Sequence, residues 1–417
     1  MGDLLDKMLD DRYWLDACKH MLSKDNIDDL DKAEISRLYV EEYRKQFYEE
    51  VKEKRFKWGT CNKVMINKIG TTKKRVVYMY DIRDRYILRV MYAVFTDFYR
   101  DRLSDNCFSY KPTIRTLDAI NYLMSDKDIS YKYGLKLDIS VYFNSVKEDY
   151  LSKVVYEISN GEDEIYKLLS DLLFDKKVIY NNVEIEEYKA LIPGTAFSIF
   201  LANYVLRELD FYVVNELGLT YARYSDDIIM FSGSKEKLNE ALDKIKEKLN
   251  ETGLKINESK YEWFNPMDDI TYLGLKMVGN KVDIGDNTKK KFKKKIKHMC
   301  KVGRKLIELE GRDPYKVARD ILKRYNYRVF KTYIEDKSKF GWAYYVFRYV
   351  NTLESLREID FYLKDRVRQM ITGKNNAGNI KKVSDEKLKE LGYVSLCEMY
   401  IKFKRDFDLY CDTVDLL

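Results

Sequence analysis

The sequence is poor in several residues on which common catalytic and structural sites depend. Histidine occurs only twice in 417 residues, at His20 and His298. A hydrolase or metal nuclease that needs several imidazoles is therefore hard to build from this chain. The six cysteines contain no Cys-x-x-Cys pair, which excludes a zinc ribbon or a disulfide scaffold and favours reduced, buried thiols. Catalytic chemistry should depend on carboxylates, lysines and the backbone.

Long apolar runs and export signals are also missing. No stretch approaches the roughly 18 continuous apolar residues of a membrane span. The acidic start, Met1–Asp11, lacks the basic and apolar regions of a signal peptide. We therefore expect a cytoplasmic protein that does not act at a membrane. Only four prolines occur, which predicts long elements and few flexible linkers.

The composition that remains is that of a folded protein with a large core. Apolar residues make up 45% of the chain and charged residues 35%. At about 150 residues per domain, the length predicts two or three units. The net charge of +7 is too small to indicate a polyanionic partner by itself. Whether the chain binds one must be judged from where the charges lie along the sequence.

Helical and strand-like patterns alternate through the first two thirds of the chain. The patterns predict helices over residues 4–22, 32–55, 84–102, 197–217 and 235–252. They predict strands over residues 64–69, 75–80, 133–139, 178–180, 183–185, 221–224, 228–231, 254–256 and 270–277. Beyond residue 288 the pattern is helical almost to the end. We expect an α+β core with helical N- and C-terminal additions.

Two distant segments place aspartates at the ends of predicted strands. Asp226 and Asp227 lie between two apolar strands, and Asp138 ends a strand much earlier in the chain. The Asp-Asp pair could equally be a polar hairpin tip, since the dipeptide occurs four times. If the strands are neighbours, three carboxylates converge, and such a set without histidine suits Mg²⁺. Two such ions can activate a 3′ hydroxyl and stabilise a leaving pyrophosphate.

Three motifs resemble those of the reverse transcriptase family and occur in the same order along the chain. Tyr224-Ser225-Asp226-Asp227 matches its YxDD box, and residues 137–143 match its first catalytic strand. Residues 193–203 resemble the QGxxxSxxLAN segment between them, with Pro193 in place of the glutamine. The resemblance extends over about residues 62–277. It implies a right-hand polymerase fold of fingers, palm and thumb, with an antiparallel palm sheet.

The resemblance also implies roles for individual residues. It gives metal ligands for two Mg²⁺ ions, with Mn²⁺ as a substitute, at Asp138, Ile139, Asp226 and Asp227. It gives a proton donor for the leaving pyrophosphate at Lys260. It gives nucleotide-binding residues at Lys74, Arg75, Arg85, Phe143 and Gly194, with the Phe143 ring excluding a 2′ hydroxyl. Each has a plainer interpretation: solvated charges, a core phenylalanine and a loop glycine.

Around the core we expect three further segments. Residues 1–60 form an N-terminal helical region, 61–285 the fingers and palm, 286–372 a helical thumb, and 373–417 a helical tail. The thumb begins with a lysine-rich run that is suited to phosphate contacts, or to a solvated helix face. The lysines predicted to contact nucleic acid are Lys289, Lys290, Lys293, Lys294 and Lys297. The tail could cap the thumb, dock on the palm or mediate self-association.

The altered middle motif and the helical tail are most similar to prokaryotic defence-associated and abortive-infection (unknown-group) reverse transcriptases, and the asparagine-alanine-histidine signature of retron enzymes is absent. This resemblance implies an RNA-directed DNA polymerase in antiphage defence. The implied partners are deoxynucleotides, an RNA template such as a dedicated non-coding RNA, and a DNA product. Synthesis without a conventional template, a homo-oligomer and a partner protein stay open.

Two other functions compete with this one. The first is an RNA-binding maturase or scaffold for which the polymerase chemistry is dispensable. The second is an RNA-dependent RNA polymerase, which requires a smaller residue than Phe143 beside the sugar.

Overall fold

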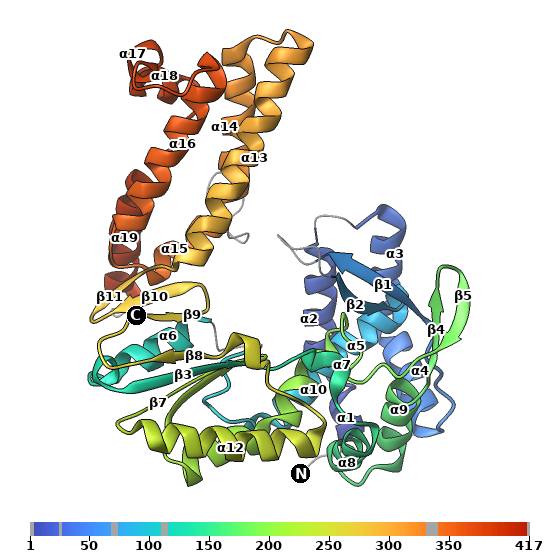
Figure 1. Ribbon diagram of the computed structural model, residues 1–417. Coiled ribbons are helices and arrows are strands. Elements are labelled where there is room, and N and C mark those ends of the chain that lie inside the picture. The colour runs from blue at the N-terminus through green and yellow to red at the C-terminus, as the bar shows by residue number, and fades with distance from the viewer. Residues whose placement is uncertain (1–3, 25–26, 68–73, 110–115, 331–340, 415–417) are drawn as a thin grey trace. The chain divides into compact units, whose positions relative to one another are not determined.

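The computed structural model describes residues 4–24, 27–67, 74–109, 116–330 and 341–414 (Figure 1). The chain divides into two compact units, Met1–Pro266 and Met267–Leu417. Helices combine with sheets that are largely antiparallel, which confirms the α+β class. The finer division into N-terminal region, fingers and palm, thumb and tail stays a prediction.

The first unit begins with four helices, α1 (Leu4–Lys7), α2 (Asp11–Leu22), α3 (Asp29–Leu38) and α4 (Glu41–Lys52). The single helix predicted over residues 4–22 is wrong. Asp10 is extended and its side chain accepts a hydrogen bond from the Arg12 N–H, so it caps a new helix. The single helix predicted over residues 32–55 is also two, because Val40 is extended and precedes α4.

The first sheet has the strand order β2-β1-β4-β5. Its strands are β1 (Cys61–Asn67), β2 (Lys74–Met79), β4 (Lys177–Tyr180) and β5 (Val183–Glu186). Within the described residues, the strands predicted over 64–69 and 75–80 form the antiparallel pair β1–β2. Those predicted over 178–180 and 183–185 form the antiparallel pair β4–β5, while β1 and β4 are parallel. Asn181 and Asn182 join β4 to β5 with φ of 51° and 63°, the left-handed values that a type I′ turn requires.

The second sheet has the order β6-β7-β3-β8, and all of its neighbours are antiparallel. Its strands are β3 (Tyr133–Asp138), β6 (Thr220–Tyr224), β7 (Asp227–Ser232) and β8 (Glu262–Phe264). Helix α12 (Lys235–Thr252), which has the predicted bounds, packs against β3 and β7. The strand predicted over residues 254–256 is wrong, because Ile256 makes only an isolated bridge to Ile139.

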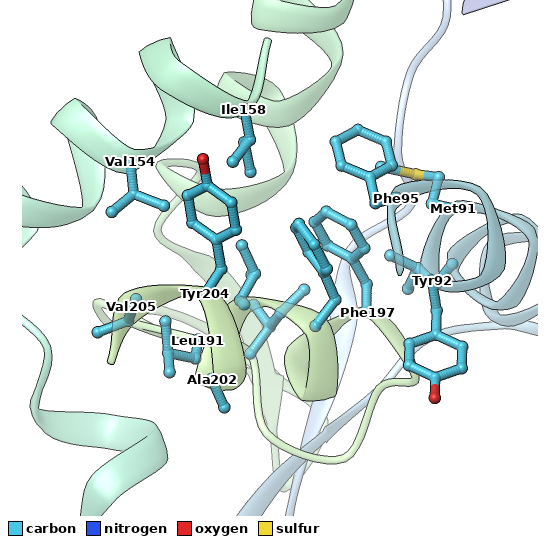
Figure 2. Packing of buried hydrophobic residues seen from close by; sticks show 14 of the residues in the cluster. Met91, Tyr92, Phe95, Val154, Ile158, Leu191, Phe197, Ala202, Tyr204 and Val205 are labelled. Atoms are coloured by element: carbon cyan, nitrogen blue, oxygen red, sulfur yellow. The ribbon is translucent and has the colours of Figure 1, made fainter. Parts of the chain in front are cut away.

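The core of this unit is built around α10 (Phe197–Val205), which is buried on nearly all sides. Figure 2 shows its side chains against those of α5 (Ile82–Phe98) and α8 (Glu148–Ile158). The Phe95 and Phe197 rings meet edge to face, with their centroids 5.1 Å apart. The single long helix predicted over residues 197–217 is divided: α10 ends at Val205, and α11 (Arg207–Phe211) and a π-helical turn, Tyr212–Glu216, follow it. The apolar run of α10 is thus explained by burial rather than by amphipathicity.

Shorter elements complete the first unit. They are α6 (Thr116–Ser125), α7 (Tyr142–Ser145), α9 (Asp163–Leu173) and the 3₁₀ turns Arg100–Arg102, Ile129–Tyr131 and Glu258–Lys260.

The second unit joins a small sheet to helices. The sheet has the order β11-β10-β9, with β9 (Ile270–Tyr272), β10 (Leu275–Val278) and β11 (Lys281–Ile284), so the predicted strand 270–277 is a hairpin. The helices are α13 (Asp286–Glu310), α14 (Pro314–Phe330), α15 (Trp342–Tyr349), α16 (Glu354–Thr372), α17 (Asn379–Lys382), α18 (Asp385–Glu390) and α19 (Leu396–Val414). Helices α13, α14 and α16 pack against one another (Figure 1). A Cβ on Gly303 of α13 would lie 2.4 Å from the Met370 sulfur, so glycine permits this close packing.

Candidate active site

The predicted acidic hairpin forms between β6 and β7. Tyr224 pairs with Asp227, which leaves Ser225 and Asp226 as a two-residue turn. Ser225 has φ of 59°, a left-handed value that non-glycine residues seldom adopt and that tight hairpin turns need. We call residues 225–227 the acidic turn.

Strand β3 places the third carboxylate beside the acidic turn. Asp138 is directly opposite Asp227 in the β3–β7 ladder, where Cβ atoms are about 4.5–5.5 Å apart. The Ile139 N–H donates to the Asp226 carbonyl at 3.0 Å, which ties the end of β3 to the turn. The convergence of the three aspartates expected from the sequence is therefore observed.

The pleat of the sheet separates the acids from the core. Leu135 and Leu137 are fully buried and belong to the hydrophobic core. Because side chains alternate between the two faces of a strand, Lys136 and Asp138 point to the opposite face. Asp227 shares that face with Asp138, since the two are paired across the ladder.

Two of the carboxylates carry a charge that their surroundings disfavour. Burial raises the pKa of Asp227 to about 6, and the charges of Asp226 and Asp138 act in the same direction, although Lys136 opposes them. Burial, and then the charge of Asp138, also raise the pKa of Asp226. Crowded carboxylates in a partly desolvated place are stabilised by a nearby cation.

Lys260 supplies one such cation. Its Nζ lies 2.7 Å from Asp138 Oδ2, in the 3₁₀ turn Glu258–Lys260. The lysine side chain is 56% exposed, so it can leave this position at little cost. The structure thus places Lys260 at the acidic site, as predicted, while its role as a proton donor stays a prediction.

The donor set fits divalent metal ions. Three carboxylates, and a backbone carbonyl at Ile139, are hard oxygen ligands of the kind that Mg²⁺ prefers. Within the described part of the chain, no group of three or more His, Cys, Asp or Glu side chains already stands in an arrangement that would hold one ion. Metal binding would therefore require the carboxylates to turn and Lys260 to release Asp138.

The structure separates the two predicted triphosphate cations on β2. Successive strand residues point to opposite faces. Arg75 shares a face with Val77, whose Cβ lies beside Gly194. Burial raises the pKa of Asp226, and the charge of Arg75 weakly opposes that rise. Lys74 points to the other face of β2, so the geometry favours Arg75 as the nucleotide-binding residue.

Arg85 lies elsewhere in the unit. Its Nε donates to the Asp81 carbonyl at 3.4 Å. Burial, followed by the charges of Arg85 and Arg89, lowers the pKa of Lys24, which places Arg85 near the end of α2. Among the described contacts, none joins Arg85 to the acidic turn. Its binding of a nucleotide stays a prediction that the geometry does not favour.

Gly194 is held against β2. Its φ is +103°, and an added Cβ would lie 2.8 Å from the Val77 Cβ and 3.2 Å from the Tyr78 carbonyl oxygen. The Tyr78 N–H donates to the Pro193 carbonyl at 2.7 Å, so the 193–194 segment lies along the edge of β2. Glycine is needed here for contact with the protein itself, and Gly194 is also exposed beside the face that carries Arg75.

Phe143 is partly exposed in α7 and packs against the core. Its ring lies 5.3 Å from that of Tyr142, and its carbonyl accepts from the Leu191 N–H at 3.1 Å. A core phenylalanine would be fully covered, whereas this ring keeps an accessible surface near the end of β3. That position is compatible with the predicted contact to the sugar.

The predicted thumb lysines in the second unit fall into two groups. Lys289 and Lys293 pair with Glu358 of α16 at 2.8 and 2.5 Å, so their charges are engaged within the protein. Lys290, Lys294 and Lys297 are exposed, and no described residue forms an ion pair with them.

Sequence reasoning missed two features near the acids. Lys136 opposes the rise that burial causes in the pKa of Asp227, and it pairs with Glu262 at 3.1 Å. Arg223 is completely buried and pairs with buried Asp210 at 2.6 Å. Both cations lie within otherwise apolar strands. A charge inside an apolar strand was the available signal for both.

Residues 66–277 match the family described as "Reverse transcriptase (RNA-dependent DNA polymerase)". Since this match covers half of the chain and includes all three motifs, the chain belongs to the reverse transcriptase family. None of the described helices has both the length and the hydrophobicity needed to cross a membrane.

The similarity to an individual relative covers a shorter part of the chain than the family match. A stretch of 116 residues is 33% identical to the Retron Ec86 reverse transcriptase of Escherichia coli, covering 27% of this chain and 36% of that protein. The chain thus matches little more than a third of the length of this relative. The relative is bacterial, in agreement with the expected resemblance to prokaryotic members.

The solved structures that are similar to the chain include telomerases. The apo telomerase of Candida tropicalis is 12% identical, with a TM-score of 0.47 over 80% of this chain and 59% of that one. A telomerase from Candida albicans in complex with a fragment of telomeric RNA is 11% identical, with a TM-score of 0.43 over 87% and 68%.

Proposed function

We propose that the chain is an RNA-directed DNA polymerase that adds deoxynucleotides with the help of two divalent ions. One observation carries this proposal. Asp138 lies directly opposite Asp227 in a family whose YxDD motif forms the adjoining turn. A binding protein has no need for three crowded acids, which destabilise one another.

The proposed ligands of the ions are Asp138, Asp226, Asp227 and the Ile139 carbonyl. Bound Mg²⁺, or Mn²⁺ in its place, would lower the pKa of the primer hydroxyl and neutralise charge on the pyrophosphate. The protein's own groups do the positioning. Arg75 holds the triphosphate, Phe143 lies beneath the sugar, and Lys260, once released from Asp138, donates a proton to the leaving group.

The direct test is primer extension by the purified protein. We expect labelled deoxynucleotides to be incorporated on an RNA template with Mg²⁺. Asp226→Asn, which keeps the side chain's shape, should reduce incorporation by several orders of magnitude. Asp269→Asn is a matched control, because Asp269 belongs to another Asp-Asp pair and bonds Lys276 in the second unit. Equal activity of wild type and Asp226→Asn would contradict the proposal.

The biological setting that we propose is antiphage defence with a non-coding RNA template or unconventional templating. The support is the resemblance of the middle motif and helical tail to defence-associated enzymes. Cells that carry the wild-type gene should survive phage challenge, and cells with Asp226→Asn should not. Sequencing the nucleic acid that copurifies with the protein would identify the template. Equal survival of both strains would argue against this setting.

A second candidate is an RNA-binding maturase or scaffold on a polymerase fold. The ion pair between Lys260 and Asp138 favours it, since it already neutralises one of the three acids. Under this alternative, Asp138→Ala and Asp227→Ala variants would keep full biological activity.

An RNA-dependent RNA polymerase is the third alternative. The partly exposed ring of Phe143 disfavours it. Wild type should prefer deoxynucleotides, and Phe143→Ala should incorporate ribonucleotides more readily. A wild-type preference for ribonucleotides would support this alternative.

A further inference from the structure

Arg223 is a fully buried charge in β6, directly before the YxDD motif. Its Nε and Nη2 donate to the two carboxylate oxygens of Asp210 in α11, at 2.7 and 2.6 Å. Asp210 is buried as well, and its Oδ1 also accepts from the Tyr221 hydroxyl at 2.7 Å. This bidentate pair lies in the core beneath the acidic turn.

The guanidinium has donors beyond those that Asp210 uses. Its Nη1 donates to the Ser225 carbonyl at 3.2 Å, and its Nη2 lies 3.4 Å from the Asn203 carbonyl of α10. Tyr221 and Arg223 share one face of β6, because strand residues two apart point the same way. The Arg223 side chain therefore links two helices of the core to the first residue of the acidic turn.

The backbone of Arg223 is also held. Its N–H donates to the Asn106 carbonyl at 2.9 Å, and its carbonyl accepts from the Phe108 N–H at 2.8 Å. The 106–108 segment thus lies along the outer edge of β6, where the sheet would otherwise be open. Because both the backbone and the side chain of Arg223 are fixed, its guanidinium holds the Ser225 carbonyl in a fixed position.

Ser225 is the residue that needs an anchor. Its left-handed backbone is unfavourable for serine, and such strain persists only where the surroundings impose it. A buried ion pair is a poor source of stability, since apolar residues of similar size are often as good or better. A role for this pair in fixing the turn explains why charges occupy this place.

We propose that the Arg223–Asp210 pair positions the acidic turn for metal binding. By holding the Ser225 carbonyl, it fixes the neighbouring Asp226 and Asp227 in the orientation from which they take up divalent ions. The inference rests on the proposed polymerase function. Arg223 touches neither substrate nor metal and is a positioning residue.

Two variants test this role. The double variant Arg223→Met/Asp210→Leu removes both charges together and fills the space with apolar atoms, so no buried charge is left unpaired. Arg223→Lys keeps the buried cation, but a single ammonium cannot bond both Asp210 oxygens and the Ser225 carbonyl in the same geometry. The matched control is Arg207→Met/Glu157→Leu. Arg207 also lies in α11 and binds both Glu157 oxygens, at 2.7 and 2.6 Å, away from the turn.

The measurements are Mn²⁺ binding without nucleotide, followed by electron paramagnetic resonance, and kcat and KM in primer extension. We expect the double variant to fold, with Mn²⁺ affinity and kcat lowered by about 10–100-fold, as for other residues that orient metal ligands. KM for the deoxynucleotide should stay nearly unchanged. The Mn²⁺ affinity and kcat of Arg223→Lys should lie between those of wild type and the double variant, and the control should match wild type.

Mn²⁺ affinity and kcat at the wild-type level in the folded Arg223 variants would overturn the inference. If circular dichroism shows that the double variant is unfolded, Arg223→Lys decides alone. Failure of the wild-type protein to bind Mn²⁺ and to extend a primer would instead count against the proposed function.

Discussion

At the scale of single residues, neighbours in the sequence have different surroundings. Lys74 and Arg75 are adjacent cations on β2 that look interchangeable in the sequence. The pleat sends them to opposite faces, and only Arg75 faces the side on which Gly194 packs. We therefore expect the two residues to differ in how much they contribute to nucleotide binding.

We expect Arg75→Ala to raise KM for the deoxynucleotide by about tenfold or more, because a hydrogen bond to a charged group contributes about 1.5–3 kcal/mol. Lys74→Ala, the matched control, should change KM by less than about threefold, as a surface charge does. Steady-state primer extension measures both. A larger effect at Lys74 would show that the nucleotide approaches the other face of β2.

At the scale of elements, helix α13 divides its lysines by face. Residues 289, 293, 296, 300 and 303 follow one side of the helix, where Ile296, Cys300 and Gly303 are buried and Lys289 and Lys293 meet Glu358. Lys290, Lys294, Lys297, Lys301 and Lys305 follow an exposed stripe on another side. At 1.5 Å per residue this stripe is about 22 Å long, enough to follow several phosphates.

The triple variant Lys290→Ala/Lys294→Ala/Lys297→Ala should therefore weaken binding to a primer–template duplex. The slope of log affinity against log salt is negative, and we expect it to become shallower by about 2–3, since each lost phosphate contact removes about 0.9. Fluorescence anisotropy over a salt series measures this slope. Lys289→Ala/Lys293→Ala is the control and should leave the slope nearly unchanged, and the reverse pattern would contradict the assignment.

Helix α19 begins at a cap supplied by another helix. Buried Asp360 of α16 accepts hydrogen bonds from the Ser395 hydroxyl at 2.6 Å and from the N–H groups of Leu396 and Cys397 at 2.9 and 3.1 Å. These are the free N–H groups of the first turn of α19, so Asp360 caps that helix across the tertiary structure.

Asp360→Ala should destabilise the protein by about 1–3 kcal/mol, because it leaves buried N–H groups without an acceptor. Urea unfolding followed by circular dichroism measures the loss. The exposed neighbour Phe361→Ala is the control and should change stability by less than about 0.5 kcal/mol. Equal stability of Asp360→Ala and wild type would show that the cap is dispensable.

At the scale of the whole molecule, the acidic turn lowers the stability of the folded chain, and the proposed metal binding would offset that loss. Asp226 and Asp227 are crowded with Asp138 in a partly buried place, which raises the pKa values of both and weakens the folded protein at neutral pH. A ligand that binds only the folded chain offsets this cost.

We expect Mg²⁺ at about 100 times its Kd to stabilise the protein by about 2.7 kcal/mol. Differential scanning calorimetry should show this as a rise of several degrees in the unfolding temperature. Asp227→Asn should be more stable than wild type without Mg²⁺ and should lose most of the rise. A rise of the same size in Asp227→Asn would show that Mg²⁺ acts elsewhere.

The sequence by itself determined most of the local elements and the residue types that meet at the candidate site. Alternation and turn residues identified the strand pairs β1–β2 and β4–β5 of the first sheet, the strand of Asp138 and helix α12, because these patterns depend on adjacent residues. Helix breaks at Asp10 and Val40 escaped prediction, since the apolar spacing continues across them. The three acids were predictable because each ends or joins a strong strand pattern.

Only the tertiary structure decided which side chains meet. The pairing of Arg223 with Asp210, the capping of α19 by Asp360 and the engagement of Lys289 and Lys293 by Glu358 all join separate elements. Such contacts depend on register and on packing angles that are set by the whole core. A run of neighbouring residues carries too little information to fix them.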